Sequence, residues 1–157
     1  MNNNFLNVYN NLIKLTRNKY IFENISNKET FSDRLTIFFF HFAFFLKVYK
    51  NQTSKKDLQN LYDFVFKQIE LSIREIGYGD SSVNKKMKLY VNLMYSIIDK
   101  VELWKKLNLS EKTKFFSDFI KVKKESHFFI NYFNKYEDYL SKKSLNYFTK
   151  DVISHKF

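Results

Sequence analysis

The sequence predicts an all-α protein, a single-domain bundle of about five to six helices around a central Phe-rich helix. Turn residues are nearly absent, because the 157 residues include no Pro and only 2 Gly, whereas sandwiches and barrels need such residues often. Hydrophobic residues make up 45% of the chain, with 19 Phe and 11 Tyr, which is enough to fill a core. Since no linker-like stretch divides the chain, we expect one helical domain over residues 1–157.

Helical spacing of apolar residues predicts the first three helices in turn. Residues 4–22 fit an amphipathic helix. The second helix is expected from about 30–32 to about 50, and its segment 35–46 (LTIFFFHFAFFL) is apolar on every side, as in a helix surrounded by others. That segment is shorter than the roughly 20 residues that a membrane span requires. A third helix follows Ser54, a typical N-cap, and its apolar stripe extends over residues 58–76.

Both glycines lie in one short turn after the third helix. Gly77 is placed to end that helix in the left-handed conformation, and Gly79 permits a second unusual backbone angle. A fourth helix is expected over about 83–106, capped by Asp80, Ser81 or Ser82.

Residues 105–157 predict a basic C-terminal helical region. Ser110 is expected to cap a fifth helix, a sixth apolar stripe covers residues 128–140, and the pattern fades after Lys143. Taken together, the stripes predict a core that includes Phe38, Phe42, Phe45, Ile69, Ile73, Val91 and Met94.

The chain is strongly basic, but almost all of its positive charge comes from lysine. Lys plus Arg number 27 against 16 Asp plus Glu, for a net charge of +11. The only arginines are Arg17, Arg34 and Arg74, although planar recognition of phosphates and base edges favours arginine. The scarcity of arginine therefore weighs against nucleic-acid binding, while the net charge favours it. A basic helical nucleic-acid-binding module, or a general protein-interaction module, stays open as an alternative function.

Lys85, Lys86 and Lys88 crowd the expected first turns of the fourth helix. The helix macrodipole disfavours cations there, so these lysines and the free backbone N–H groups would together suit a carboxylate, a phosphate or an acidic segment. The alternative is that they form a solvated face of a Lys-rich chain.

No motif in the sequence predicts an enzyme, a metal site or a cofactor. The histidines at 41, 127 and 155 are not spaced to share a metal, and His41, inside an apolar run, is expected to be a hydrogen-bonded core residue. Gly77 and Gly79 lack the third glycine and the preceding strand of a dinucleotide site. The lack of Cys and of a signal-peptide pattern predicts a reducing, cytoplasmic location.

The segment 73–80 (IREIGYGD), followed by Val83 and the run 85–87 (KKM), resembles the signature of the ubiquinol-cytochrome c chaperone family. Further matches lie at Arg17, Asn18, Thr30, Arg34, His41 and Tyr95. The resemblance covers about residues 5–104. Departures from the family pattern lie at Asp33, Gln68, Glu70, Ser96 and Ile97.

The resemblance implies a non-enzymatic assembly chaperone that binds newly made cytochrome b, apo or newly haemylated, during biogenesis of the ubiquinol-cytochrome c reductase complex. It implies no cofactor, no requirement for nucleic acid, and a peripheral contact with the membrane or the ribosome. The location it implies is the cytoplasm or the inner face of the cytoplasmic membrane, and for a eukaryotic protein the matrix face of the mitochondrial inner membrane. The candidate partner-binding residues are Arg74, Glu75, Gly77, Gly79, Asp80, Lys85, Lys86, Lys88 and Tyr95.

Overall fold

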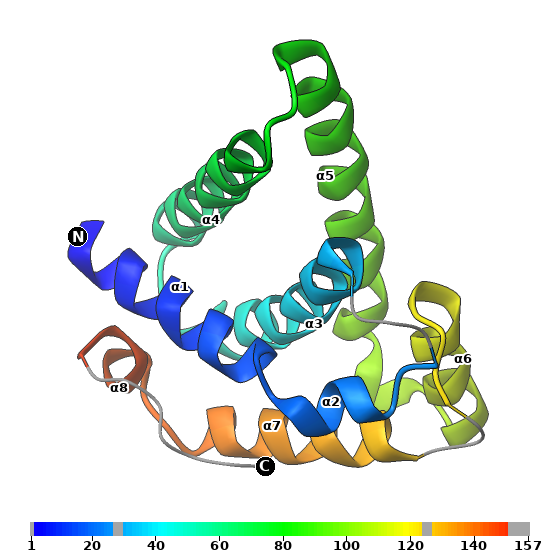
Figure 1. Cartoon of the computed structure of the whole chain (residues 1–157). Coiled ribbons are helices and arrows are strands. Elements are labelled where there is room, and N and C mark those ends of the chain that lie inside the picture. The colour runs from blue at the N-terminus through cyan, green and yellow to red at the C-terminus, as the bar shows by residue number, and fades with distance from the viewer. Residues whose placement is uncertain (1, 27–29, 124–126, 151–157) are drawn as a thin grey trace.

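The computed structural model describes residues 2–26, 30–123 and 127–150, and these residues are helical almost throughout (Figure 1). The predicted all-α class is confirmed: the described residues contain no strand, only one isolated bridge between Ile25 and Val122. Residues 2–26, 30–123 and 127–150 form eight α-helices, of which 6 have seven or more residues, in line with the five to six expected. The elements are α1 (Asn2–Thr16), α2 (Lys19–Glu23), α3 (Phe31–Tyr49), α4 (Lys55–Ile76), α5 (Asp80–Glu102), η1 (Trp104–Lys106), α6 (Leu109–Phe119), α7 (Phe128–Ser141) and α8 (Leu145–Lys150).

The Phe-rich helix α3 lies at the centre of the molecule, as predicted, with α1, α5 and α7 around it (Figure 1). Every residue from 35 to 45 is buried. The ring of Phe40, for example, lies 5.3 to 6.1 Å from those of Phe115, Phe116, Phe119 and Phe133. Such aromatic packing accounts for a large part of the burial that stabilises the fold. Over the described ranges, no helix is both long and apolar enough to cross a membrane.

The expected core residues are buried with one exception. Phe38, Phe42, Phe45, Ile69, Ile73 and Met94 have at most a few per cent of their surface exposed. Val91 is only partly buried and packs against the edge of the core, so its placement in the core was wrong. The neighbouring buried position on α5 is Tyr90.

Local side-chain caps explain where several helices begin. Thr30 Oγ1 accepts a hydrogen bond from Asp33 N, and Ser54 Oγ accepts one from Asp57 N, which confirms both predicted starts. The cap predicted at Ser110 is wrong. Asn108 caps α6 instead, in a reciprocal capping box with Glu111, so the helix begins one residue before Ser110.

The two ends of the described chain differ most from expectation. The single helix predicted over 4–22 is split, because the side chain of Asn18 accepts a hydrogen bond from Tyr20 N and starts α2 after a break. After Lys143, where the pattern fades, the chain forms α8. Its Phe148 is buried against the core, and Asn11 Nδ2 of α1 donates to the carbonyl oxygen of Phe148 at 2.9 Å.

Candidate partner-binding site

Helices α4 and α5 form a hairpin whose connecting loop projects from the body at the far end from α7 and α8 (Figure 1). We call the part from Arg74 to Lys88 the hairpin tip. Gly77 has φ 106° and closes α4 in the left-handed conformation, which confirms the predicted C-cap. Gly79 has φ −73° and ψ 165°, ordinary extended backbone, so the second unusual angle predicted there is wrong.

Helix α5 begins at Asp80, three residues earlier than expected, with Gly79 at the N-cap and no side-chain cap. The predicted capping by Asp80, Ser81 or Ser82 is therefore wrong, because these residues already belong to the first turn. Trp104 lies outside the helix, in η1, because α5 ends at Glu102.

The shift in the start of α5 changes the electrostatics of the tip. Asp80, an acid, occupies the first turn, where the macrodipole favours negative charge. Lys85, Lys86 and Lys88 lie in the second and third turns, where the dipole has largely faded. The lysines therefore lie beyond the free backbone N–H groups of the helix start, and not beside them as expected. What the lysines contribute is their own charge.

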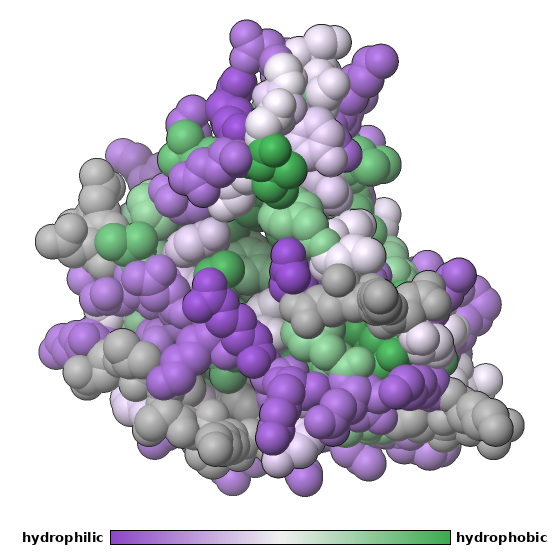
Figure 2. All heavy atoms as spheres, in the orientation of Figure 1, coloured by the Kyte–Doolittle hydropathy of each residue, from purple (hydrophilic) through white to green (hydrophobic). Residues whose placement is uncertain are grey.

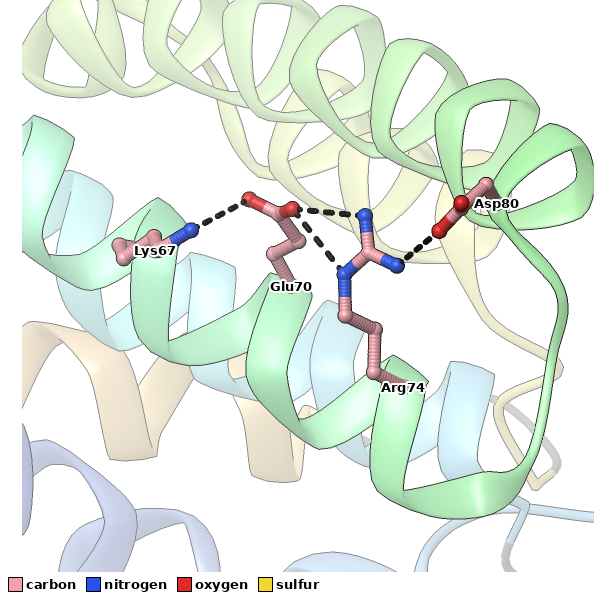
Figure 3. Close-up of polar contacts among 4 residues, drawn as sticks. All are labelled: Lys67, Glu70, Arg74 and Asp80. Carbon is pink, nitrogen blue, oxygen red and sulfur yellow. Dashed lines mark hydrogen bonds and ion pairs between the residues drawn. The ribbon is translucent and has the colours of Figure 1, made fainter.

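A chain of ion pairs joins the two helices of the hairpin (Figure 3). Arg74 donates to Glu70 through Nε at 3.3 Å and through a terminal nitrogen at 3.2 Å, and its other terminal nitrogen donates to Asp80 across the loop. Lys67 Nζ lies 3.5 Å from the second carboxylate oxygen of Glu70. The pair between Glu70 and Arg74 was expected from their four-residue spacing.

The same contacts set the protonation of these groups. The hydrogen bond from Arg74, more than the charge of Lys67, holds the pKa of Glu70 below its usual value. Hydrogen bonds to Asp80 and then to Glu70 raise the pKa of Arg74. Since Lys67, Arg74 and Asp80 are exposed and Glu70 is partly exposed, these ion pairs link the two helices but contribute little to stability.

The structure separates the predicted lysines into two kinds. Lys86 is partly buried, and its Nζ lies 4.5 Å from the centre of the Tyr78 ring, a cation–π contact that holds Tyr78 against the start of α5. Lys85 and Lys88 are exposed. They are the lysines of the tip that present their charge to solvent.

One predicted residue lies away from the loop. Tyr95 is on α5 roughly 22 Å beyond Asp80, at about 1.5 Å of rise per residue, and its ring stacks 6.1 Å from that of Tyr62. Glu75 is exposed on the last turn of α4. The eight candidates other than Tyr95 lie in the hairpin tip.

Exposed apolar side chains on the hairpin were not expected. Large hydrophobic residues that are 43% to 63% exposed on α4, the loop and α5 are Leu71, Ile76, Tyr78, Leu89 and Tyr95. Leu71 and Leu89 lie off the predicted stripes, and that signal in the sequence could have identified them. Ile76 was placed on the buried stripe, but the last turn of α4 extends past the body and leaves it 54% exposed.

His41 is a core residue, as expected. Its Nδ1 lies 2.9 Å from the carbonyl oxygen of Ile37, which can only accept, so Nδ1 carries the proton and Nε2 accepts from the hydroxyl of Tyr132 at 2.7 Å. Burial lowers the pKa of His41 to about 4. Within the described ranges no three His, Cys, Asp or Glu side chains gather to hold a metal ion. His155 lies outside those ranges.

Comparison with known proteins gives one match. The family model described as ubiquinol-cytochrome C chaperone matches residues 23–103. Searches of curated proteins and of solved structures each found no match. The matched segment contains α3, α4 and α5, and hence the whole hairpin tip, while α1 and the region from α6 onward lie outside it.

Proposed function

The chain belongs to the ubiquinol-cytochrome C chaperone family, and on that premise we propose that it binds newly made cytochrome b as a non-enzymatic assembly chaperone, with the α4–α5 hairpin as the contact surface. Membership of the family suggests a role in assembly of the reductase complex. We choose this surface because exposed apolar side chains lie on a hairpin that projects from the body.

The hairpin is suited to hold another chain because its shape is fixed before binding. Gly77 ends α4 in a short turn, after which the chain reverses direction into α5. An ion pair between Arg74 and Asp80 links the two helices, and Lys86 contacts the ring of Tyr78. A surface that is already ordered loses little conformational entropy on binding. Exposed aliphatic and aromatic groups on such a surface match the apolar segments that an incompletely assembled client exposes.

The exposed lysines add a preference for charge. Lys85 and Lys88 lie one helical turn apart on α5 and favour a client segment that carries Asp or Glu near its apolar residues. Because such rim charges are screened, they speed and orient binding more than they strengthen it. In this proposal the chain needs no cofactor and no nucleic acid. It acts in the cytoplasm, in peripheral contact with the ribosome or the inner face of the cytoplasmic membrane, and in a eukaryote at the matrix face of the mitochondrial inner membrane.

Site-specific photocrosslinking in the native host tests this function. A photoreactive amino acid replaces Leu89, which is 63% exposed on the hairpin, and as a matched control replaces Leu109, which is 56% exposed on α6. Crosslinked products are probed for cytochrome b. We expect a cytochrome b adduct from position 89 and a much weaker one from position 109.

Charge reversal then tests the lysines. The Lys85→Glu, Lys88→Glu variant leaves the contact between Lys86 and Tyr78 intact, and the control Lys55→Glu, Lys56→Glu makes the same charge change on exposed lysines at the start of α4. We expect the first variant to lower the yield of the position 89 adduct at normal protein abundance, and the control to leave it unchanged. An equal loss in both variants would show a response to net charge alone. No cytochrome b adduct from position 89 would refute the hairpin as the contact surface.

A further inference from the structure

A series of nearly parallel aromatic rings extends from the core to the surface of the hairpin. Phe39 of α3 stacks on Phe66 of α4 with ring centres 5.6 Å apart, and Phe66 stacks on Tyr62 at 4.5 Å. Tyr62 in turn stacks on Tyr95 of α5 at 6.1 Å, with 16° between the ring planes. Since Tyr95 is 54% exposed, the series ends in a ring that is supported on one face and open to solvent elsewhere.

An exposed carboxylate lies beside this open ring. Asp99 is one helical turn after Tyr95 on α5, and residues four apart on a helix lie on the same side with Cβ atoms about 5 to 6 Å apart. Other acidic groups of the hairpin, Glu70, Asp80 and Glu102, each form an ion pair with Lys or Arg. Among the residues that the structure describes, Asp99 has no such partner, so its charge is free to bind another chain.

The charges near the two stacked tyrosines differ in sign along the hairpin. Burial chiefly raises the pKa of Tyr62, with smaller contributions from Tyr95 and from the charge of Asp63, which follows Tyr62 on α4 and accepts a hydrogen bond from Gln59. On the same face of α5 as Tyr95, the exposed Lys88 lies two turns toward the tip, at about 10 Å along the helix. This face of the hairpin is therefore positive toward the tip and negative around the tyrosines.

A guanidinium group suits an open aromatic ring beside a carboxylate. Its flat face stacks on the ring, and its edge donates two parallel hydrogen bonds to the carboxylate. A lysine ammonium has neither the plane nor the fork. Figure 2 shows hydrophilic side chains beside the projecting end of the hairpin and apolar side chains gathered between α4 and α5. An arginine that has apolar residues near it in its own chain therefore matches the hairpin.

We propose that Tyr95 and Asp99 bind an arginine side chain of the client, with the guanidinium stacked on the ring of Tyr95 and hydrogen-bonded to the carboxylate of Asp99. This inference rests on the proposed function, because it names a contact that the client makes on the same hairpin. A membrane protein carries an excess of Lys and Arg in the short loops at its inner face, next to its apolar segments. Such a loop supplies the arginine, and an acidic residue about 10 Å from it meets Lys88.

Peptides test this contact with the purified chain. The probes are short fluorescein-labelled peptides that cover the inner-face loops of the host's cytochrome b, and fluorescence anisotropy measures their binding. In the peptide that binds most tightly, arginine is replaced by citrulline, which keeps the shape without the charge, and separately by lysine, which keeps the charge without the plane. We expect each replacement to weaken binding to the wild-type chain by about threefold or more.

Variants of the chain assign these differences to the two residues. Asp99→Asn should remove the difference between the arginine and citrulline peptides, and Tyr95→Leu should remove the difference between the arginine and lysine peptides. Tyr95→Phe keeps the ring and should bind all three peptides as the wild type does. The control Asp138→Asn makes the same charge change on an exposed residue of α7 and should keep both differences.

Several results would overturn the proposal. They are a tightest peptide that contains no arginine, equal binding of the arginine and citrulline peptides, a preference for arginine that persists in Asp99→Asn, and binding by none of the peptides. If Tyr95→Leu does not fold, Asp99→Asn and Tyr95→Phe carry the test. A cytochrome b adduct from position 89 alongside any of the contrary results would leave the proposed function in place, so the two failures are distinguishable.

Discussion

The protonation of His41 gives a quantitative prediction for the stability of the fold. His41 is fully buried, and its pKa is lowered to about 4 from the usual 6.5. As the pH falls below 6.5 the unfolded chain binds a proton that the folded chain does not, so stability is fully present above pH 6.5 and is lost as the pH falls toward 4. One proton changes the free energy of unfolding by about 1.4 kcal/mol per pH unit. Because the loss begins near pH 6.5, about 1.5 pH units above pH 5, the free energy of unfolding falls by about 2 kcal/mol between pH 7 and pH 5.

Urea unfolding at a series of pH values measures this loss, with His41→Gln as the variant and His127→Gln as the control. His127 is exposed at the start of α7, so replacing it should leave the pH dependence unchanged. The His41 variant should be less stable at pH 7, because its hydrogen bonds with Ile37 and Tyr132 change, but its stability should vary little between pH 7 and pH 5. An NMR titration of the wild-type chain that finds His41 with a pKa near 6.5 would refute the reasoning.

Three further substitutions test the packing and the caps through the free energy of unfolding. Phe42→Ala, in the fully buried face of α3, should cost about 3 to 5 kcal/mol, and a cost below about 1 kcal/mol would mean that the helix is not central. Gly77→Ala should cost about 1 kcal/mol because Gly77 has a positive φ, even though nothing lies within 4 Å of the added Cβ. Gly79→Ala, the control, should change the free energy of unfolding by less than about 0.5 kcal/mol. Equal costs for the two variants would refute the assignment of strain to Gly77. Asn108→Ala removes the capping box of α6 and should cost about 1 kcal/mol, while Ser110→Ala, its matched control, should cost little.

The features that the sequence predicts well are those decided by nearby residues. The apolar run 35–46 predicts a buried helix because its composition leaves no polar face, and Ser54 predicts a helix start because its hydroxyl reaches an N–H three residues away. The start of α6 is also decided by nearby residues, because Asn108 and Glu111 have the spacing of a capping box, and this reciprocal pair caps the helix in place of the single hydroxyl of Ser110.

The features that sequence reasoning missed depend on contacts between distant segments. Helix α8 has a weak pattern of its own and is held by Phe148 and by hydrogen bonds from Asn7 and Asn11, more than 130 residues away in the chain. The exposure of Ile76 depends on how far α4 extends past the body. A pocket between α1, α3 and α4 requires the tertiary fold, because its lining residues come from three separate helices.

The role in reductase assembly is tested most directly by deleting the gene in its native host and measuring cytochrome b in membranes from its reduced-minus-oxidised absorbance spectrum. We expect the deletion to lower cytochrome b, the wild-type gene and the Lys55→Glu, Lys56→Glu form to restore it, and the Lys85→Glu, Lys88→Glu form to restore only part of it at equal protein abundance. Membranes from the deletion strain with an unchanged amount of cytochrome b would contradict the account.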